Sequence, residues 1–160
     1  MKTMQFIAAC ALLAGASATF AHGNIGHAPT AATPEQKAWG IAGKAKDAQR
    51  AITLNMTDDM RFAPSHFSVK KGETLRLRVV NKGQVMHEVV LGTQTSLDEH
   101  AQMMLKYPGM EHAEPYMAHV APGQSKDLVW SFNRAGNFDF ACLIAGHYQA
   151  GMTGRFTVTE

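Results

Sequence analysis

The chain has 160 residues, which is enough for one domain with a hydrophobic core and some additional sequence. Its 15 lysines and arginines stand against 13 aspartates and glutamates and form no basic cluster, so nucleic acid is not an expected partner. The 10 methionines and 8 histidines are unusual, and they suit soft-metal chemistry or arise by chance.

The first 21 residues have the three parts of a signal peptide. Lys2 begins a positive region, residues 6–14 are apolar, and residues 16–21 offer the small side chains that signal peptidase prefers. We therefore expect residues 1–21 to be removed on export to the periplasm. Residues 7–10 faintly resemble a lipoprotein box, but too few apolar residues precede Cys10 to favour lipid anchoring. No stretch is apolar for long enough to span a bilayer, so membrane insertion is not expected.

Removal of the signal peptide leaves Cys142 as the single cysteine of an exported protein. Cysteines in oxidising compartments usually pair, so a lone thiol requires an explanation. Metal ligation is one explanation. The other is a buried, inert cysteine that packs as a small hydrophobe.

Residues 22–50 are rich in alanine, glycine and proline, and we expect a flexible segment there. From residue 51 onward, short runs that alternate in polarity are separated by turn residues, which is typical of strands. The runs lie near residues 52–56, 66–70, 75–79, 85–91, 128–132, 138–142 and 156–158. This pattern predicts an all-β domain over residues 51–160, an antiparallel sandwich of Greek-key type if crossovers are needed.

One helical segment interrupts the strands, within a predicted insertion at residues 96–121. Ser96 is the expected N-cap with Glu99 at the capping-box position. Pro108 predicts that the helix ends near Lys106. The predicted apolar face consists of residues at helical spacing, Leu97, Ala101, Met104 and Leu105.

The strongest chemical signal lies in a glycine-punctuated loop near the C-terminus. Cys142, His147 and Met152 follow one another at intervals of five residues. A thiolate, an imidazole and a long axial thioether are three of the four ligands of a mononuclear blue-copper centre. His87 is the candidate for the second imidazole, because a sandwich would bring its strand beside this loop. Taken singly, each residue has a structural alternative: Cys142 and Met152 could be core, and His87 a hydrogen-bonded strand residue.

Several motifs in order resemble the plastocyanin/azurin cupredoxins. They are residues 60–64 (MRFAP), residues 69–75 (VKKGETL), His87-Glu88, and residues 138–142 (FDFAC) followed by His147 and Met152. With Met103-Met104, residues 108–112 and residues 150–152 added, the chain is most similar to periplasmic copper-tolerance cupredoxins of the CopI type. The resemblance covers roughly residues 51–160. It implies a cupredoxin sandwich of about eight strands with one copper at one end.

Two residues depart from the family pattern. Plastocyanin-like proteins often have asparagine after the first histidine, where its amide steadies the cysteine loop, and this chain has Glu88. Many have proline before the glycine of the ligand loop, and this chain has Ala145. The surroundings of the metal, and with them its potential and colour, are therefore expected to differ.

Further methionines and histidines in the insertion are candidates for an accessory copper site, because thioether and imidazole suit Cu(I). They are His100, Met103, Met110, His112, Met117 and His119. The alternative is that methionines fill gaps under loops, as predicted for Met104. His22 is a related candidate, since cleavage after Ala21 would pair its imidazole with a new terminal amine.

The sequence favours a type 1 (blue or green) copper-binding protein that acts in copper tolerance by binding copper or handing it on. The alternative is a small periplasmic electron carrier with the same Cu(I)/Cu(II) site, which would need an exposed apolar docking patch from Leu143, Ile144 and Tyr148. Copper ions are the expected partner, and a periplasmic redox or copper-transfer protein is the candidate protein partner. An enzyme is not expected, because Cys142 has no adjacent histidine that would relay electrons to a catalytic copper.

Overall fold

Ten strands, one α-helix and one short 3-10 helix make up the described part of the chain, residues 33–110 and 112–160 of a computed structural model. The predicted signal peptide over residues 1–21 and the candidate ligand His22 lie outside the described residues. No helix within those residues has the length and apolar character that crossing a bilayer requires.

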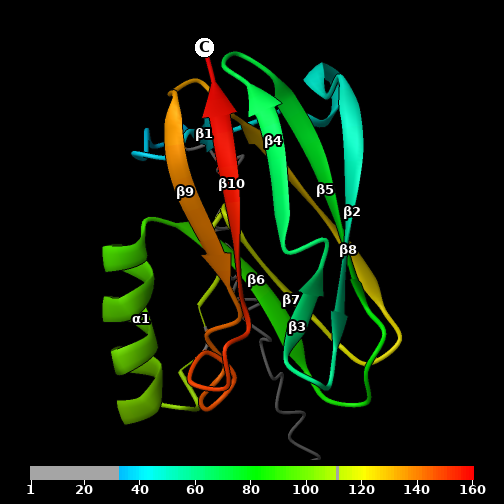
Figure 1. Cartoon of the computed structure of the whole chain (residues 1–160), viewed down its shortest axis with the longest axis vertical. Coiled ribbons are helices and arrows are strands. Elements are labelled where there is room, and N and C mark those ends of the chain that lie inside the picture. Colours follow the sequence, from blue (N-terminus) through cyan, green and yellow to red (C-terminus); the bar gives the residue numbers. More distant parts are fainter. Residues whose placement is uncertain (1–32, 111) are drawn as a thin grey trace, which may run out of the picture. The chain divides into compact units, whose positions relative to one another are not determined.

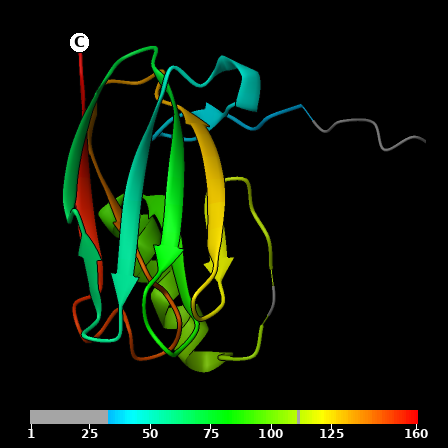
Figure 2. The same cartoon turned by 90° about the vertical axis from the view of Figure 1, so that its right-hand side faces the viewer.

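The strands form two five-stranded sheets that face each other as a sandwich (Figures 1 and 2). One sheet has the order β1-β8-β5-β2-β3 and the other the order β4-β10-β9-β6-β7. The pairs β2–β5 and β4–β10 are parallel, and the remaining pairs are antiparallel. The strands are β1 (Ile41–Ala42), β2 (Arg50–Thr57), β3 (Arg61–Ala63), β4 (His66–Lys70), β5 (Thr74–Asn81), β6 (His87–Gly92), β7 (Met117–Val120), β8 (Ser125–Ser131), β9 (Gly136–Ala141) and β10 (Thr153–Thr159).

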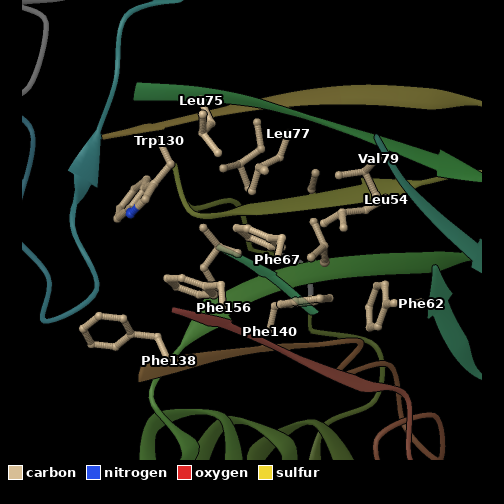
Figure 3. Close-up of a cluster of buried hydrophobic side chains, with 14 of the residues drawn as sticks. Leu54, Phe62, Phe67, Leu75, Leu77, Val79, Trp130, Phe138, Phe140 and Phe156 are labelled. Carbon is tan, nitrogen blue, oxygen red and sulfur yellow. The ribbon is translucent and has the colours of Figure 1, made fainter. Parts of the chain in front are cut away.

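The alternation that predicted the strands also places the core. In β5, Leu75, Leu77 and Val79 are fully buried, whereas Arg76 and Arg78 point outward toward Asp127. Figure 3 shows the buried side chains of the two sheets meeting in one layer. Aromatic rings dominate its centre: Phe67 and Phe156 stack with centroids 5.4 Å apart, and Phe62 meets Phe140 edge-on at 5.0 Å. The all-β sandwich fold is therefore confirmed, with ten strands where about eight were expected.

The predicted helix is present as α1 (Gln94–Lys106), with two corrections. Its N-cap is Thr93, whose hydroxyl accepts a hydrogen bond from the Ser96 backbone N–H. In return the Ser96 hydroxyl accepts one from the Thr93 backbone N–H, which completes a capping box. The expected cap at Ser96 was wrong because both residues can cap and only geometry separates them. Leu105, placed on the apolar face from the sequence, is 44% exposed. The buried face is Leu97, Ala101 and Met104, and it packs against β6 and β9.

The described unit begins at Thr33, earlier than the boundary at residue 51 that the sequence suggested. Trp39 is buried in the main core, and its carbonyl accepts a hydrogen bond from the Trp130 indole at 2.9 Å. Strand β1 then pairs with the edge of β8, and the 3-10 helix η1 (Ala45–Asp47) leads into β2. Residues 33–50 are thus part of the sandwich, because one large aromatic residue anchors a segment of otherwise weak signal.

The predicted insertion is shorter than residues 96–121. Its last part forms β7, which pairs with β6 at the edge of the second sheet. The loop over residues 142–152, orange in Figure 1, lies at the end of the sandwich opposite the C-terminus, together with the turn that precedes β6. Segments from distant parts of the sequence therefore meet at this end.

Candidate metal centre

Three of the predicted ligands converge at this end of the sandwich. His87 is the first residue of β6, not a mid-strand residue as expected, while Cys142 follows the last residue of β9. One ligand atom each from His87, Cys142 and His147 lies within 4.8 Å of the other two. The Cys142 Sγ and the His147 Nδ1 are 3.3 Å apart, and the two imidazole centroids are 5.0 Å apart.

The His87 ring is fully buried and held from one side. Its Nε2 lies 3.0 Å from the Asp58 Oδ1, whereas its Nδ1 is buried without a hydrogen-bond partner among the described residues. The backbone amide of Gln84 donates to the same carboxylate, and these contacts lower the pKa of Asp58 below its usual value. In a metal-binding histidine, one imidazole nitrogen usually bonds to a carboxylate or similar group, and the other nitrogen is left for the metal.

The Cys142 thiol is a buried group whose proton is held tightly. Burial raises its pKa to about 12, and the charge of the nearby Glu88 acts in the same direction. Burial also lowers the pKa of His147, helped by the charge of His87. At neutral pH the copper-free cluster therefore offers a neutral imidazole at His147 and a protonated thiol.

Backbone hydrogen bonds tie the ligand loop together. The Cys142 amide donates to the Met152 carbonyl at 3.0 Å, and the Met152 amide donates to the His147 carbonyl at 3.1 Å. The turns between them use positive φ angles at Gly146 (+92°) and Gly151 (+86°), a conformation that glycine adopts without strain. The Met152 side chain is fully buried in the same core cluster as Cys142. The loop thus brings the thioether residue back beside the thiol.

Glu88 gives the loop the support that family members take from asparagine. Its side chain is 1% exposed, and its Oε1 accepts a hydrogen bond from the Leu143 amide at 2.9 Å, next to Cys142. Its Oε2 lies 2.6 Å from the His119 Nε2. The departure from the family pattern therefore keeps the tie to the cysteine loop and adds a buried carboxylate beside the thiol.

Helix α1 clamps the loop from outside. The Tyr148 hydroxyl, next to His147, donates to the Asp98 carboxylate at 2.6 Å and accepts from the side-chain Nε2 of Gln94 at 2.8 Å. Burial and the Asp98 contact raise the pKa of Tyr148 to about 12. Helix α1, the one α-helix among the described residues, thus holds one face of the ligand loop.

The donor set fits copper. Two imidazoles and a thiol in a rigid, largely buried pocket, with a buried methionine in the same loop, are the ligand types of a mononuclear copper site. The unpartnered Nδ1 of His87 supplies an independent sign, since a buried polar atom without a partner is costly unless something binds it.

The candidate accessory ligands separate into groups. His100 on α1 and His112 in the following loop bring their Nε2 atoms to 2.7 Å. Met117 and His119 were expected in the insertion but lie on β7, where Met117 is buried under α1 and His119 contacts Glu88. Met103 and Met110 are exposed, whereas Met104 is core as expected.

Two supporting groups could not be found from the sequence. Asp58 lies in a turn 29 residues before His87, and nothing in its local pattern distinguishes it from other turn aspartates. The link from Tyr148 to Asp98 joins residues 50 positions apart. Both contacts depend on the packed fold.

Comparisons with known proteins point in one direction. The family described as copper binding proteins, plastocyanin/azurin family, matches residues 48–159. The chain is 48% identical over 132 residues to the copper-resistant cuproprotein CopI of Rubrivivax gelatinosus, which covers 82% of this chain and 78% of that protein. It is 34% identical over 151 residues to the copper-resistant cuproprotein CopI of Pseudomonas aeruginosa, with 76% and 83% covered.

A solved structure shares the fold. Reduced auracyanin from the photosynthetic bacterium Roseiflexus castenholzii superimposes with a TM-score of 0.61, covering 71% of this chain and 99% of its own. The sequence identity is 19%, so this likeness concerns the fold alone.

Proposed function

This chain belongs to the plastocyanin/azurin family of copper-binding proteins, and from that premise we propose that it is a periplasmic type 1 copper protein that acts in copper tolerance. Its cofactor is copper. In this proposal the ligands are His87, Cys142, His147 and Met152, and the protein limits free copper by binding it or handing it on.

The convergence of the His87, Cys142 and His147 ligand atoms within 4.8 Å carries the proposal. Asp58 orients one imidazole, and Glu88 and Tyr148 hold the loop that carries the other ligands. Bound copper would supply a one-electron Cu(I)/Cu(II) couple. The protein's part is to hold the ligands in one rigid arrangement that serves both oxidation states and to keep water away from the thiolate.

The names of the relatives support the proposed biological role. Two of them are called copper-resistant cuproproteins, and neither name is that of an enzyme. The signal-peptide pattern of residues 1–21 supports a periplasmic location, where excess copper would be met. In this proposal the copper domain starts near Thr33 and residues 1–21 are removed.

The role can be tested by complementation. A strain without this gene should grow poorly in excess copper, and the full-length gene should restore growth. Cys142→Ala should not restore it, although the variant protein is present in the periplasmic fraction. His66→Ala is a control, because His66 is an exposed histidine of β4 that is not one of the clustered residues. Full rescue by Cys142→Ala would contradict the proposed role of the site.

Electron transfer is the second candidate, and one observation favours it. Val85 and Met86, just before His87, are 43% and 44% exposed, and Met86 lines a surface hollow together with Ile144. Leu143, expected in the docking patch, is only 1% exposed and packs in the buried cluster under α1, so it cannot contribute to a docking surface. Val85 and Met86 supply exposed apolar surface in its place. Normal copper tolerance with impaired respiration in the deletion strain would favour the carrier over the tolerance protein.

A further inference from the structure

A second group of metal-binding side chains gathers in a surface hollow between α1 and the loop that follows it. The hollow is lined by two imidazoles, two thioethers and two carboxylates, from His100, Met103, Met110, His112, Glu99 and Glu114. None of the six belongs to the cluster around Cys142. Negative charge at its rim favours a cation.

The two imidazoles already point at one another. The Nε2 atoms of His100 and His112 are 2.7 Å apart, with ring centroids 4.7 Å apart. Metal–imidazole bonds are about 2.0 Å long, so two such nitrogens on one ion would lie roughly 3 to 4 Å apart. A movement on the order of 1 Å would therefore admit an ion between them. The Nδ1 of His112 is buried without a hydrogen-bond partner in the described residues, so no bond there fixes which nitrogen carries the proton.

The methionines of the hollow have no packing role that would explain them. Met103 is 44% exposed and Met110 is 37% exposed, whereas the neighbouring Met104 and Met117 are 6% and 8% exposed and fill the core under α1. The gap-filling explanation therefore accounts for the second pair and not for the first. Met103 stands three residues after His100, on the same side of the helix.

We propose that His100, Met103, Met110 and His112 form a second copper site that prefers Cu(I). Thioethers are soft ligands that select Cu(I), and imidazole accepts copper in either state. Being on the surface and without a thiolate, this site would exchange its ion more readily than the buried cluster does.

The second site would lie close to the first. The His112 ring meets the His119 ring at 6.2 Å, and His119 contacts Glu88, which in turn bonds to the Leu143 amide beside Cys142. This short chain of contacts places a surface copper site next to the buried one. A protein that takes up copper could receive the ion at such a surface.

The proposal is testable without the first site. In Cys142→Ala protein that lacks residues 1–21, and with them Cys10, Cu(I) stoichiometry can be measured by competition with a coloured Cu(I) chelator. Changing His100 or His112 to alanine in that background should lower the stoichiometry by one ion. His66→Ala, at a histidine outside the hollow, should leave it unchanged. Because the parent lacks the thiol, failure of the proposed type 1 site would not alter the outcome.

Two further measurements guard against misfolding and against copper bound elsewhere. Thermal unfolding of each variant should match that of the parent, since the hollow is on the surface. In the parent, Cu(I) should shift the NMR signals of the His100 and His112 rings at the first equivalents added. Unchanged stoichiometry in both alanine variants, or ring signals that do not respond to Cu(I), would overturn the second site.

Discussion

Cys142 holds its proton more tightly than a free thiol does, because its side chain is fully buried. With a pKa of about 12, the thiol is protonated throughout the physiological range. In the proposed site copper binds the Cys142 thiolate, so the ion must displace that proton. Between neutral pH, where His147 is already neutral, and the pKa of the thiol, the affinity should therefore rise about tenfold for each unit of increase in pH.

This linkage predicts proton release that can be counted. At pH 8 in weak buffer, Cu(I) binding to the wild-type chain should release about one proton more than Cu(I) binding to Cys142→Ala. His147 adds none, because burial lowers its pKa and leaves it neutral. A pH electrode during the titration measures the difference. Equal proton release by the two proteins would mean that the thiol is not the ligand.

The proposed ligands were the part of the site most visible in the sequence, and the residues that support them were the least visible. Cys142, His147 and Met152 lie within one short loop, so chemistry and spacing are visible together. His87 required the sandwich prediction and the family resemblance. Asp58 orients His87 from a turn far away in sequence, and only the folded backbone places it there.

Helix α1 is the element that distinguishes the surroundings of the ligand loop. Its contact through Tyr148 joins the residue next to His147 to two polar side chains on the first turns of the helix. The helical period of the sequence predicted the helix itself. The period carries no information on which loop the polar face would meet.

Tyr148→Phe should loosen this clamp. Loss of the hydroxyl removes the bonds to Asp98 and Gln94, and we expect the copper-free protein to lose about 1 kcal/mol of unfolding free energy. Urea unfolding measures the loss. Tyr107→Phe is the matched control, because Tyr107 lies at the helix end and is 51% exposed. If both variants lost the same amount, the hydroxyl would have no part in holding the loop.

Thr93→Ala tests the corrected start of the helix. The Thr93 hydroxyl accepts from the Ser96 backbone, so its removal should cost about 1 kcal/mol. Thr95→Ala, at an exposed neighbouring threonine inside the helix, is the control and should have little effect. Chemical unfolding of both variants gives the two losses of unfolding free energy and shows whether Thr93 is the N-cap. A larger loss for Thr95→Ala would place the helix start elsewhere.

At the scale of the whole molecule, the sandwich was predictable because alternation of polarity recurs in strands such as β4, β5 and β10. The start of the domain was not. Residues 33–50 have few large apolar residues, so their composition resembles that of a linker. Trp39 nevertheless packs into the core and meets the Tyr116 ring edge-on at 5.4 Å.

Trp39→Ala should therefore destabilise the whole domain. Removing a large buried aromatic side chain costs about 3–5 kcal/mol, and Trp39 is 8% exposed. Urea unfolding monitored by circular dichroism gives the value. Val85→Ala, at an exposed apolar residue, should change stability little. If Trp39→Ala had no larger effect than Val85→Ala, residues 33–50 would not belong to the cooperative unit.

The central claim is that Cys142 is a copper ligand together with His87, His147 and Met152. Titration of the chain without residues 1–21 with Cu(II), followed by visible absorption, tests it most directly. The wild-type protein should develop an intense thiolate-to-copper band that saturates at one copper, and Cys142→Ala should develop none. A wild-type protein that binds copper without this band would contradict the claim.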